Sequence, residues 1–186
     1  TAADRTVIVS SATVTPSSPT FATTFTSPNF SVPATIFAAR STTDQYNGVA
    51  YLVTIAVTTA GGFETLKAFK RIIASTRPVK NTNPSISDLL ANGAPFNTMP
   101  SGAAVASAVV PVSATENFSV ADGNSNISSQ TESLTLTWFS TEGSFDKTRT
   151  LNNEPNGFSP GTKPDNRTPI AVVVVRDGRG GEGYIQ

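Results

Sequence analysis

Apolar and polar residues alternate with a period of two along much of the chain, while helical spacing is nearly absent. The clearest alternation is YLVTIAVTT at residues 51–59, and FETLKAFKRII at residues 63–73 follows it across Gly61-Gly62. A Gly-Gly turn between two such segments favours a β-hairpin. Four apolar residues of the second segment also recur at helical spacing, so a helix over residues 63–73 is the alternative: Phe63, Leu66, Phe69 and Ile73.

Further short segments are rich in β-branched residues and are separated by proline, glycine and asparagine, which is typical of strands between turns. The sequence predicts strands at residues 6–11, 34–40, 86–90, 108–114, 134–140 and 170–176. Between the hairpin and the later strands, the segment RPVKNTNP at residues 77–84 has no apolar periodicity and reads as a linker. We therefore expect an all-β protein made of two tandem immunoglobulin-like β-sandwich domains, residues 1–77 and 78–186.

The segment LTLTW at residues 134–138 predicts a buried face in the second domain. Alternation places Leu134, Leu136 and Trp138 on one side of a strand, and a central tryptophan commonly fills the space between two sheets. Asp177-Gly178 is expected to turn the chain, with Gly180-Gly181 permitting positive φ. The last strand would face Trp138 in one of two registers: Val172 with Val174, or Val173 with Val175.

The composition excludes several classes of function. The chain has 186 residues, no histidine, no cysteine, and 13 basic against 13 acidic side chains. Ser-His-Asp and Cys-His catalysis, the common zinc sites and disulfides are therefore excluded, and no basic surface for nucleic acid is expected. Ser144 and Lys147 match a Ser-x-x-Lys spacing, but they follow the Gly143 turn rather than beginning a buried helix, so we expect no enzyme. No stretch approaches the about 20 apolar residues that span a membrane.

An oxygen-rich segment at residues 121–126 is the weak candidate for a metal site. Asp122, Asn124 and Asn126, with Glu132 and Asp177, could supply oxygen ligands to Ca²⁺, although the spacing is not that of an EF-hand. The favoured alternative is a turn whose side chains bond their own backbone, so no cofactor is expected. The glycine-rich residues 178–183 likewise read as a flexible closing segment rather than a phosphate loop. Aromatic residues in predicted loops could bind a partner or hold loops to the core: Phe21, Phe25, Phe30, Tyr46, Phe96 and Phe118.

Three motifs follow one another within residues 83–186: LTLTW with GSF at 143–145, FSP at 158–160, and a valine-rich strand that ends in DGRGG. In this order they resemble the bacterial extracellular immunoglobulin-like domains of the PKD/cadherin-like kind. Such domains occur in tandem in surface lipoproteins of predatory and gliding bacteria such as Bdellovibrio and the myxobacteria. The resemblance implies a structural core that contains Leu136, Trp138, Phe145, Phe158 and Asp177.

The chain departs from this family at two points. Phe158 stands where such domains usually carry tryptophan, and the turn at residues 121–126 has fewer carboxylates than the family's acidic turn. We expect a non-catalytic module exported to the cell surface or outer membrane of a bacterium, anchored by lipid on a segment outside this sequence. It would act in adhesion, spacing or protein interaction, with a protein or glycan partner. The alternatives are an accessory carbohydrate- or calcium-binding module of a secreted enzyme, or a phage- or capsid-type structural subunit.

Overall fold

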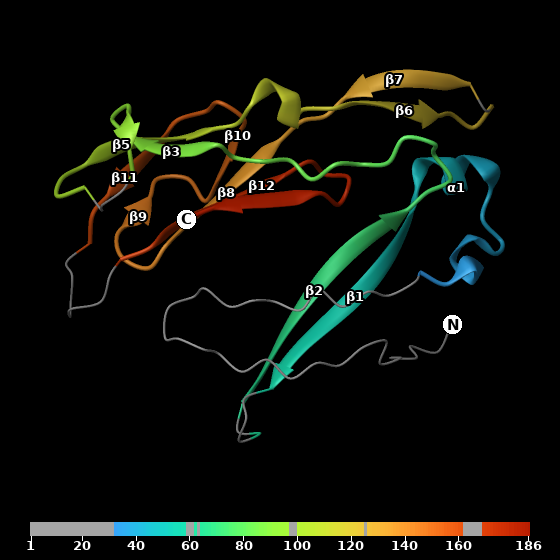
Figure 1. Cartoon of the computed structure of the whole chain (residues 1–186), viewed down its shortest axis with the longest axis horizontal. Helices are drawn as coiled ribbons and strands as arrows, with labels where there is room; N and C mark the ends of the chain where they lie inside the picture. Colours follow the sequence, from blue (N-terminus) through green and yellow to red (C-terminus); the bar gives the residue numbers. More distant parts are fainter. Residues whose placement is uncertain (1–31, 59–61, 63, 97–99, 125, 162–168) are drawn as a thin grey trace. The chain divides into compact units, whose positions relative to one another are not determined.

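The computed structural model describes residues 32–58, 62, 64–96, 100–124, 126–161 and 169–186 (Figure 1). The chain divides into two compact units, Thr1–Ala38 and Ala39–Gln186. Strands dominate the described ranges, and every strand pair in them is antiparallel. The prediction of an all-β protein is therefore confirmed. The strand predicted at residues 6–11 lies outside the described residues.

The strand predicted at residues 34–40 is wrong. This segment contains the 3₁₀ helix η1, Ala34–Phe37, in which the Ile36 amide donates to the Pro33 carbonyl oxygen at 3.0 Å. Ala39 then takes a positive φ of 58°, which reverses the chain and cannot continue a strand. Local turn hydrogen bonds therefore replace the cross-strand partners that the apolar pattern alone suggested.

A short helix and a long hairpin begin the second unit. Helix α1, Thr42–Asn47, is capped at its N-terminus by Ser41, whose side chain accepts from the Asp44 amide at 3.0 Å. Strands β1, Val49–Thr58, and β2, Thr65–Ala74, pair over their full length, from Val49 opposite Ala74 to Thr58 opposite Thr65. The hairpin prediction is confirmed and the helical alternative is wrong. Most of the predicted Gly-Gly turn lies outside the described residues.

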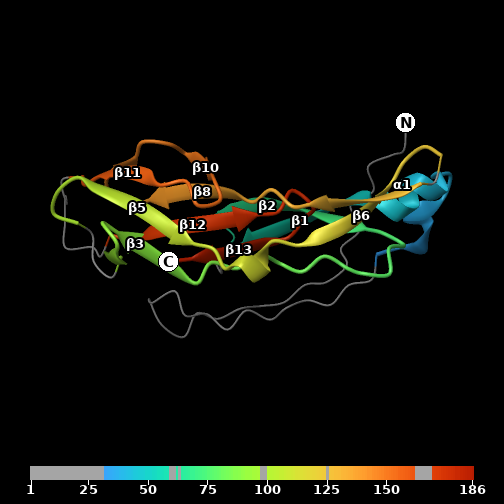
Figure 2. The same ribbon diagram turned by 90° about the horizontal axis from the view of Figure 1, so that it is seen from above.

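Two larger sheets follow, and their strands can be traced in Figure 1 and, from above, in Figure 2. The first has the order β4-β3-β5-β11-β9, with β3 Asp88–Ala91, β4 Ala94–Pro95, β5 Ala104–Val109, β9 Ser144–Phe145 and β11 Asn156–Ser159. The second has the order β10-β8-β12-β13, with β8 Thr135–Ser140, β10 Arg149–Leu151, β12 Ala171–Arg176 and β13 Glu182–Ile185. A separate pair, β6 Asn117–Ala121 and β7 Ile127–Thr131, follows the 3₁₀ helix η2, Val112–Ala114.

One hydrophobic cluster joins the two larger sheets. Leu136 and Trp138 of β8 meet Val173 and Val175 of β12 and Phe158 of β11 in this cluster. Of the two registers left open for the last strand, the structure has Val173 opposite Trp138 and buried. Phe145 is half-buried, with its ring centroid 5.1 Å from that of Trp138 and 5.0 Å from that of Phe158. These six side chains include four of the residues assigned to the core from the sequence: Leu136, Trp138, Phe145 and Phe158.

Several predicted boundaries need correction. The strand predicted at residues 108–114 ends at Val109, because Pro111 has no amide hydrogen and leads into η2. The segment at residues 178–183 is not a flexible end, because β13 begins at Glu182 and pairs with β12 from Arg176 to Val173. Strands at residues 86–90, 134–140 and 170–176 are confirmed within two residues as β3, β8 and β12.

Residues 77–84 contain no strand, as expected of a linker, but they are held to the rest of the unit. Arg77 is buried, and the Asn81 side chain donates to the Asp177 carboxylate. The predicted boundary between residues 77 and 78 lies inside the unit Ala39–Gln186. Within the described part of residues 1–77 the only sheet is the β1–β2 hairpin, so two tandem sandwiches stay a prediction.

Candidate functional site

The base of the β1–β2 hairpin is joined to β6 through one asparagine. Asn47, at the end of α1, donates from Nδ2 to the Ala121 carbonyl oxygen and accepts at Oδ1 from the Ala121 amide, both at 2.8 Å. The side-chain amide therefore satisfies both backbone groups of Ala121, as a neighbouring strand would. Gly48 follows with a φ of 114°, and a Cβ there would collide with Ile73, so glycine is required between α1 and β1.

Arg77 also binds the end of α1, at the junction between α1, the hairpin base and β6. It is 7% exposed, and it donates to the carbonyl oxygens of Tyr46 at 3.2 Å and Asn47 at 2.6 Å. Its guanidinium lies 5.8 Å from the Tyr46 ring centroid and 5.6 Å from that of Phe118. Burial lowers the pKa of Arg77, and the positive charge of Arg179 lowers it further. The last carbonyls of α1 thus receive a cation, which a helix C-terminus favours.

Arg179, in the turn between β12 and β13, completes a buried charge cluster. Its guanidinium lies 4.2 Å from the Phe118 ring centroid and pairs with Glu132 and, at 3.4 Å, with Glu116. The Glu132 carboxylate also accepts from the Glu116 amide at 3.0 Å. Hydrogen bonding from Thr82 lowers the pKa of Glu116, and Arg179 lowers it further. The buried carboxylate of Glu132 thus has both a cation and a backbone donor, which is typical of a structural role.

Asp177, predicted both as a core residue and as a weak metal ligand, is buried in the same turn. Its carboxylate accepts from the amides of Arg179 at 2.7 Å and Gly181 at 2.9 Å, and from the Asn81 side chain. Gly178 and Gly180 take positive φ values of 74° and 108°. Asp177 therefore shapes the turn that positions Arg179, and its oxygens are occupied by donors of the chain.

Three further metal candidates, Asp122, Asn124 and Asn126, lie in a separate turn between β6 and β7, whereas Glu132 pairs with Arg179. Asp122 Oδ1 accepts from the amides of Asn124 and Asn126 at 2.8 Å, and its Oδ2 accepts from the Asn126 side chain at 2.9 Å. The side-chain hydrogen bond from Asn126 holds the pKa of Asp122 below its ordinary value. This is the geometry of a turn that bonds its own backbone. No group of three or more His, Cys, Asp or Glu side chains that could hold a metal ion occurs in the described ranges.

The Ser-x-x-Lys pair and the loop aromatics also have structural surroundings. Lys147 is exposed and pairs with Glu154, whose pKa that hydrogen bond lowers. Phe96 meets Phe158 edge to face at a centroid distance of 5.7 Å, and it packs against the core. Tyr46 and Phe118 stack with the arginines described above. Phe21, Phe25 and Phe30 lie outside the described residues.

The β1–β2 hairpin presents exposed side chains on both faces. Cross-strand pairing places Leu52, Thr54, Lys67, Phe69 and Arg71 on one side, here called the Phe69 face. The opposite side, here called the Ile55 face, carries Val53, Ile55, Val57, Leu66, Ala68 and Lys70. Leu52 and Phe69 are 61% and 66% exposed on the first, and Val57 and Leu66 are 59% and 64% exposed on the second. Exposed apolar groups on both sides of one hairpin are typical of a binding element.

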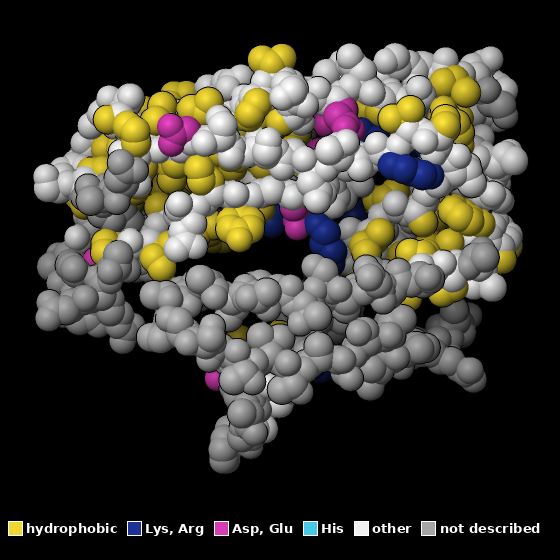
Figure 3. All heavy atoms as spheres, viewed as in Figure 1, with side chains coloured by type: hydrophobic (Ala, Val, Ile, Leu, Met, Phe, Trp, Pro, Cys, Tyr) yellow, Lys and Arg dark blue, Asp and Glu magenta, His cyan; other side chains and the backbone are white. Residues whose placement is uncertain are grey.

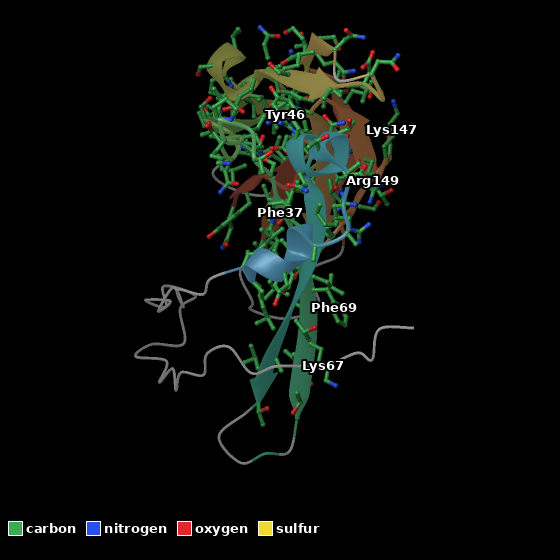
Figure 4. The ribbon with its side chains drawn as sticks, turned by 90° about the vertical axis from the view of Figure 1, so that its right-hand side faces the viewer. Phe37, Tyr46, Lys67, Phe69, Lys147 and Arg149 are labelled. Carbon is green, nitrogen blue, oxygen red and sulfur yellow. The ribbon has the colours of Figure 1, made fainter. Side chains whose placement is uncertain are left out.

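Basic side chains accompany this apolar surface. Figure 4 shows Lys67 and Phe69 projecting from the same side of β2, in agreement with the register. Lys67 and Arg71 are exposed, and neither takes part in a salt bridge with a described residue. Lys70, on the other face, pairs with Glu182 at 2.6 Å. On the face seen in Figure 3, the described side chains are mostly hydrophobic or uncharged.

Comparison with protein-family models, with curated proteins and with solved structures gives no match. In the part of the chain that the structure describes, no helix is long and apolar enough to cross a membrane. Any role of the exposed hairpin surface or of the junction around Arg77 and Arg179 therefore follows from geometry alone. Neither feature was predicted from the sequence. The exposed hairpin surface could have been predicted from the alternation that places Lys67, Phe69 and Arg71 at every second position. The junction could not, because its residues are far apart in the sequence.

Proposed function

We propose that this protein is a non-catalytic interaction module, exported to a bacterial cell surface, that binds a partner protein through the β1–β2 hairpin. The observation that carries the proposal is the hairpin itself: exposed apolar side chains on both faces and two exposed cations without acidic partners among the described residues. A two-stranded sheet is marginally stable alone, so such a surface is expected where a further layer or strand completes it.

We further propose that residues 78–186 form an immunoglobulin-like sandwich. The strand order supports this: β3, β5 and β11 occupy the places of strands A, B and E, and β8, β12 and β13 those of C, F and G. β10 beside β8 takes the place of the extra strand C′. One feature differs, because β9 lies in the place of strand D although it precedes β10 in the chain. In this alignment β6 and β7 are an insertion between strands B and C.

Site-specific photo-crosslinking in the cells that produce the protein tests the interaction. Benzoylphenylalanine is placed at position 69, and the matched control carries it at position 105, where Val105 of β5 is 53% exposed. We expect crosslinks to another protein from position 69 and none from position 105. Crosslinks from position 69 to glycan would favour the accessory carbohydrate module, and crosslinks to a second copy would favour the structural subunit. Equal crosslinking from both positions contradicts the proposal.

A further inference from the structure

Among the described residues, the outer backbone edge of β2 is unpaired along most of its length. β1 and β2 form a sheet of two strands, and no third strand pairs with either within the described ranges. Near the base, the turn between β12 and β13 approaches residues 71–73, since a Cβ added at Gly180 would lie 3.5 Å from the Arg71 carbonyl oxygen. The stretch from Thr65 to Lys70 has no backbone partner on this edge among the described residues. An open edge of this kind is a template for one more strand.

The side chains along this edge define what an added strand must carry. On the Phe69 face, Lys67 and Arg71 are two positions either side of Phe69, and all three are exposed. On the Ile55 face the neighbouring positions of β2 are Leu66 and Ala68, with Ile55 and Val57 across the pair. One side of the edge therefore carries two cations around Phe69, and the other is aliphatic apart from Lys70, which pairs with Glu182.

We propose that the hairpin binds an extended segment of a partner protein in which acidic residues alternate with apolar residues, and that this segment adds to the edge of β2 between Thr65 and Lys70. The inference rests on the proposed function of the hairpin and specifies its partner. Because side chains alternate along a strand, every acidic residue of such a segment lies on the Phe69 face, near Lys67 and Arg71. Every apolar residue lies on the Ile55 face, where it covers Leu66 and its neighbours.

An anionic lipid surface would satisfy the charges but not the backbone. Each strand of the hairpin has outward N–H and C=O groups, and a hydrocarbon environment offers them no hydrogen-bond partner. A peptide strand supplies those hydrogen bonds and the carboxylates together. The open edge therefore favours a peptide over a lipid.

The test measures binding of labelled peptides to the full chain by fluorescence anisotropy. The probe alternates Glu with Val over about six to eight residues, the usual length of a strand. The first control has the same composition in two blocks, which keeps the charge but removes the alternation. The second control carries N-methyl groups on every second amide, which removes one row of backbone hydrogen bonds. We expect each control to bind at least about tenfold more weakly than the alternating peptide.

Charge reversal in the protein tests the assigned side chains. Lys67→Glu/Arg71→Glu should weaken binding of the Glu-Val peptide at least about tenfold and create binding of an alternating Lys-Val peptide. The matched control is Arg40→Glu/Arg149→Glu, which reverses two exposed arginines away from the hairpin and should change neither affinity. Circular dichroism of each variant confirms that it folds, and rescue by the Lys-Val peptide shows that a weakened variant is still competent to bind.

Three results would overturn the inference. They are equal binding of the block peptide, binding of phosphatidylglycerol vesicles without binding of the peptide, and self-association that Phe69→Ser abolishes. If position 69 still crosslinks to a protein in cells while the Glu-Val peptide fails to bind, the acidic strand is rejected and the proposed function stands. If neither experiment gives binding, both are rejected.

Discussion

Strands β1 and β12 are both built largely of alternating or continuous β-branched residues, and they are buried to very different extents. In β12, every second residue is buried, namely Ala171, Val173 and Val175, whereas in β1 only Val49 is buried. β1 is also the longer strand and pairs over its whole length with β2. Cross-strand pairing is therefore not what separates the two regions.

The difference lies in the second layer. β12 has β8 and β13 on its two sides and belongs to a cluster that includes Phe158 from the other sheet. The hairpin has no neighbouring strand in the described ranges, and it is held at its base by Asn47, Arg77 and the Lys70–Glu182 pair. Burial of apolar area is the main stabilising contribution, so the two larger sheets supply most of the stability of this unit, whereas the hairpin leaves much of its apolar surface exposed.

The largest effect that would sharpen this comparison is expected at Trp138. Trp138→Ala removes a buried indole whose Nε1 donates to Thr150 Oγ1 at 2.8 Å, and it should lower the free energy of unfolding by about 3–5 kcal/mol. Urea unfolding followed by circular dichroism measures the change. The control is Phe139→Ala on the same strand, 51% exposed, with a cost below about 1 kcal/mol. An equal cost at the two positions would contradict the assignment of the core.

The next largest effect is expected at Arg179. Arg179→Met leaves Glu132 buried without its cation, and the side chain of Glu132 is 1% exposed, so the loss should be about 3 kcal/mol. The double variant Glu132→Gln/Arg179→Met should recover much of that loss, because the buried carboxylate is removed together with its cation. The exposed pair offers a control: Lys147→Met should change stability by less than about 1 kcal/mol. Failure of the double variant to recover would place the contribution of Arg179 in its contact with Phe118 instead.

The sequence predicts the features that one segment determines by itself, but not those that depend on contacts between residues distant in the chain. The alternation of LTLTW predicted the buried side of β8 because one face of one strand suffices to define it. The valine run of β12 has the same residue on both faces, so its register is decided only by pairing with Trp138. The segment at residues 34–40 has an apolar pattern like that of a strand, but Pro33 and the positive φ of Ala39 close it into a turn.

The junction could not be predicted for a related reason. Arg77 stands among proline and asparagine residues, where an arginine is ordinarily exposed, and its burial requires Tyr46 and Phe118 from distant parts of the chain. Arg179 lies among glycines that indicated flexibility, but Asp177 fixes that turn through three donors. Such contacts depend on tertiary packing and have no periodicity.

Removing the hairpin tests whether the two regions are separable. The fragment 78–186 keeps every residue of the core cluster, and it loses the two Asn47 hydrogen bonds to Ala121 and the Lys70–Glu182 pair. We expect it to fold alone, with a free energy of unfolding lower by about 2 kcal/mol. Thermal unfolding monitored by Trp138 fluorescence provides the measurement. An aggregate without a cooperative transition would show that the hairpin is part of the same folding unit.

Acid should weaken the unit through two carboxylates: Glu116, which bonds Thr82 and Arg179, and Glu182, which pairs with Lys70 of the hairpin. The pKa of Glu116 lies below its ordinary value of 4.5 because of hydrogen bonding from Thr82 and the charge of Arg179, and the pKa of Glu182 is lowered by Lys70. Depressed folded-state pKa values mean that the unfolded chain binds protons more readily. The contribution of the two carboxylates to the free energy of unfolding is therefore complete above pH 4.5. It is lost as the pH falls through their lower folded-state pKa values.

Urea midpoints measured between about pH 7 and pH 3 should show this decline, and Glu116→Gln should make it shallower. The contribution of Glu182 to this decline should be small, because its side chain is partly exposed to solvent. A urea midpoint that rises on acidification would contradict this prediction.

The smallest effect on stability is expected where the effect on binding is largest. Phe69→Ser removes a side chain that is 66% exposed on the Phe69 face, so the free energy of unfolding should change by less than about 0.5 kcal/mol. Tyr184→Ser is the matched control, because Tyr184 is 72% exposed on β13 and lies outside the hairpin. Both variants should unfold at nearly the urea midpoint of the original chain, but only Phe69→Ser should weaken binding of the alternating Glu-Val peptide. A loss of stability at Phe69 close to that at Trp138 would mean that the hairpin is buried in the folded protein, and the contrast between the two regions would fail.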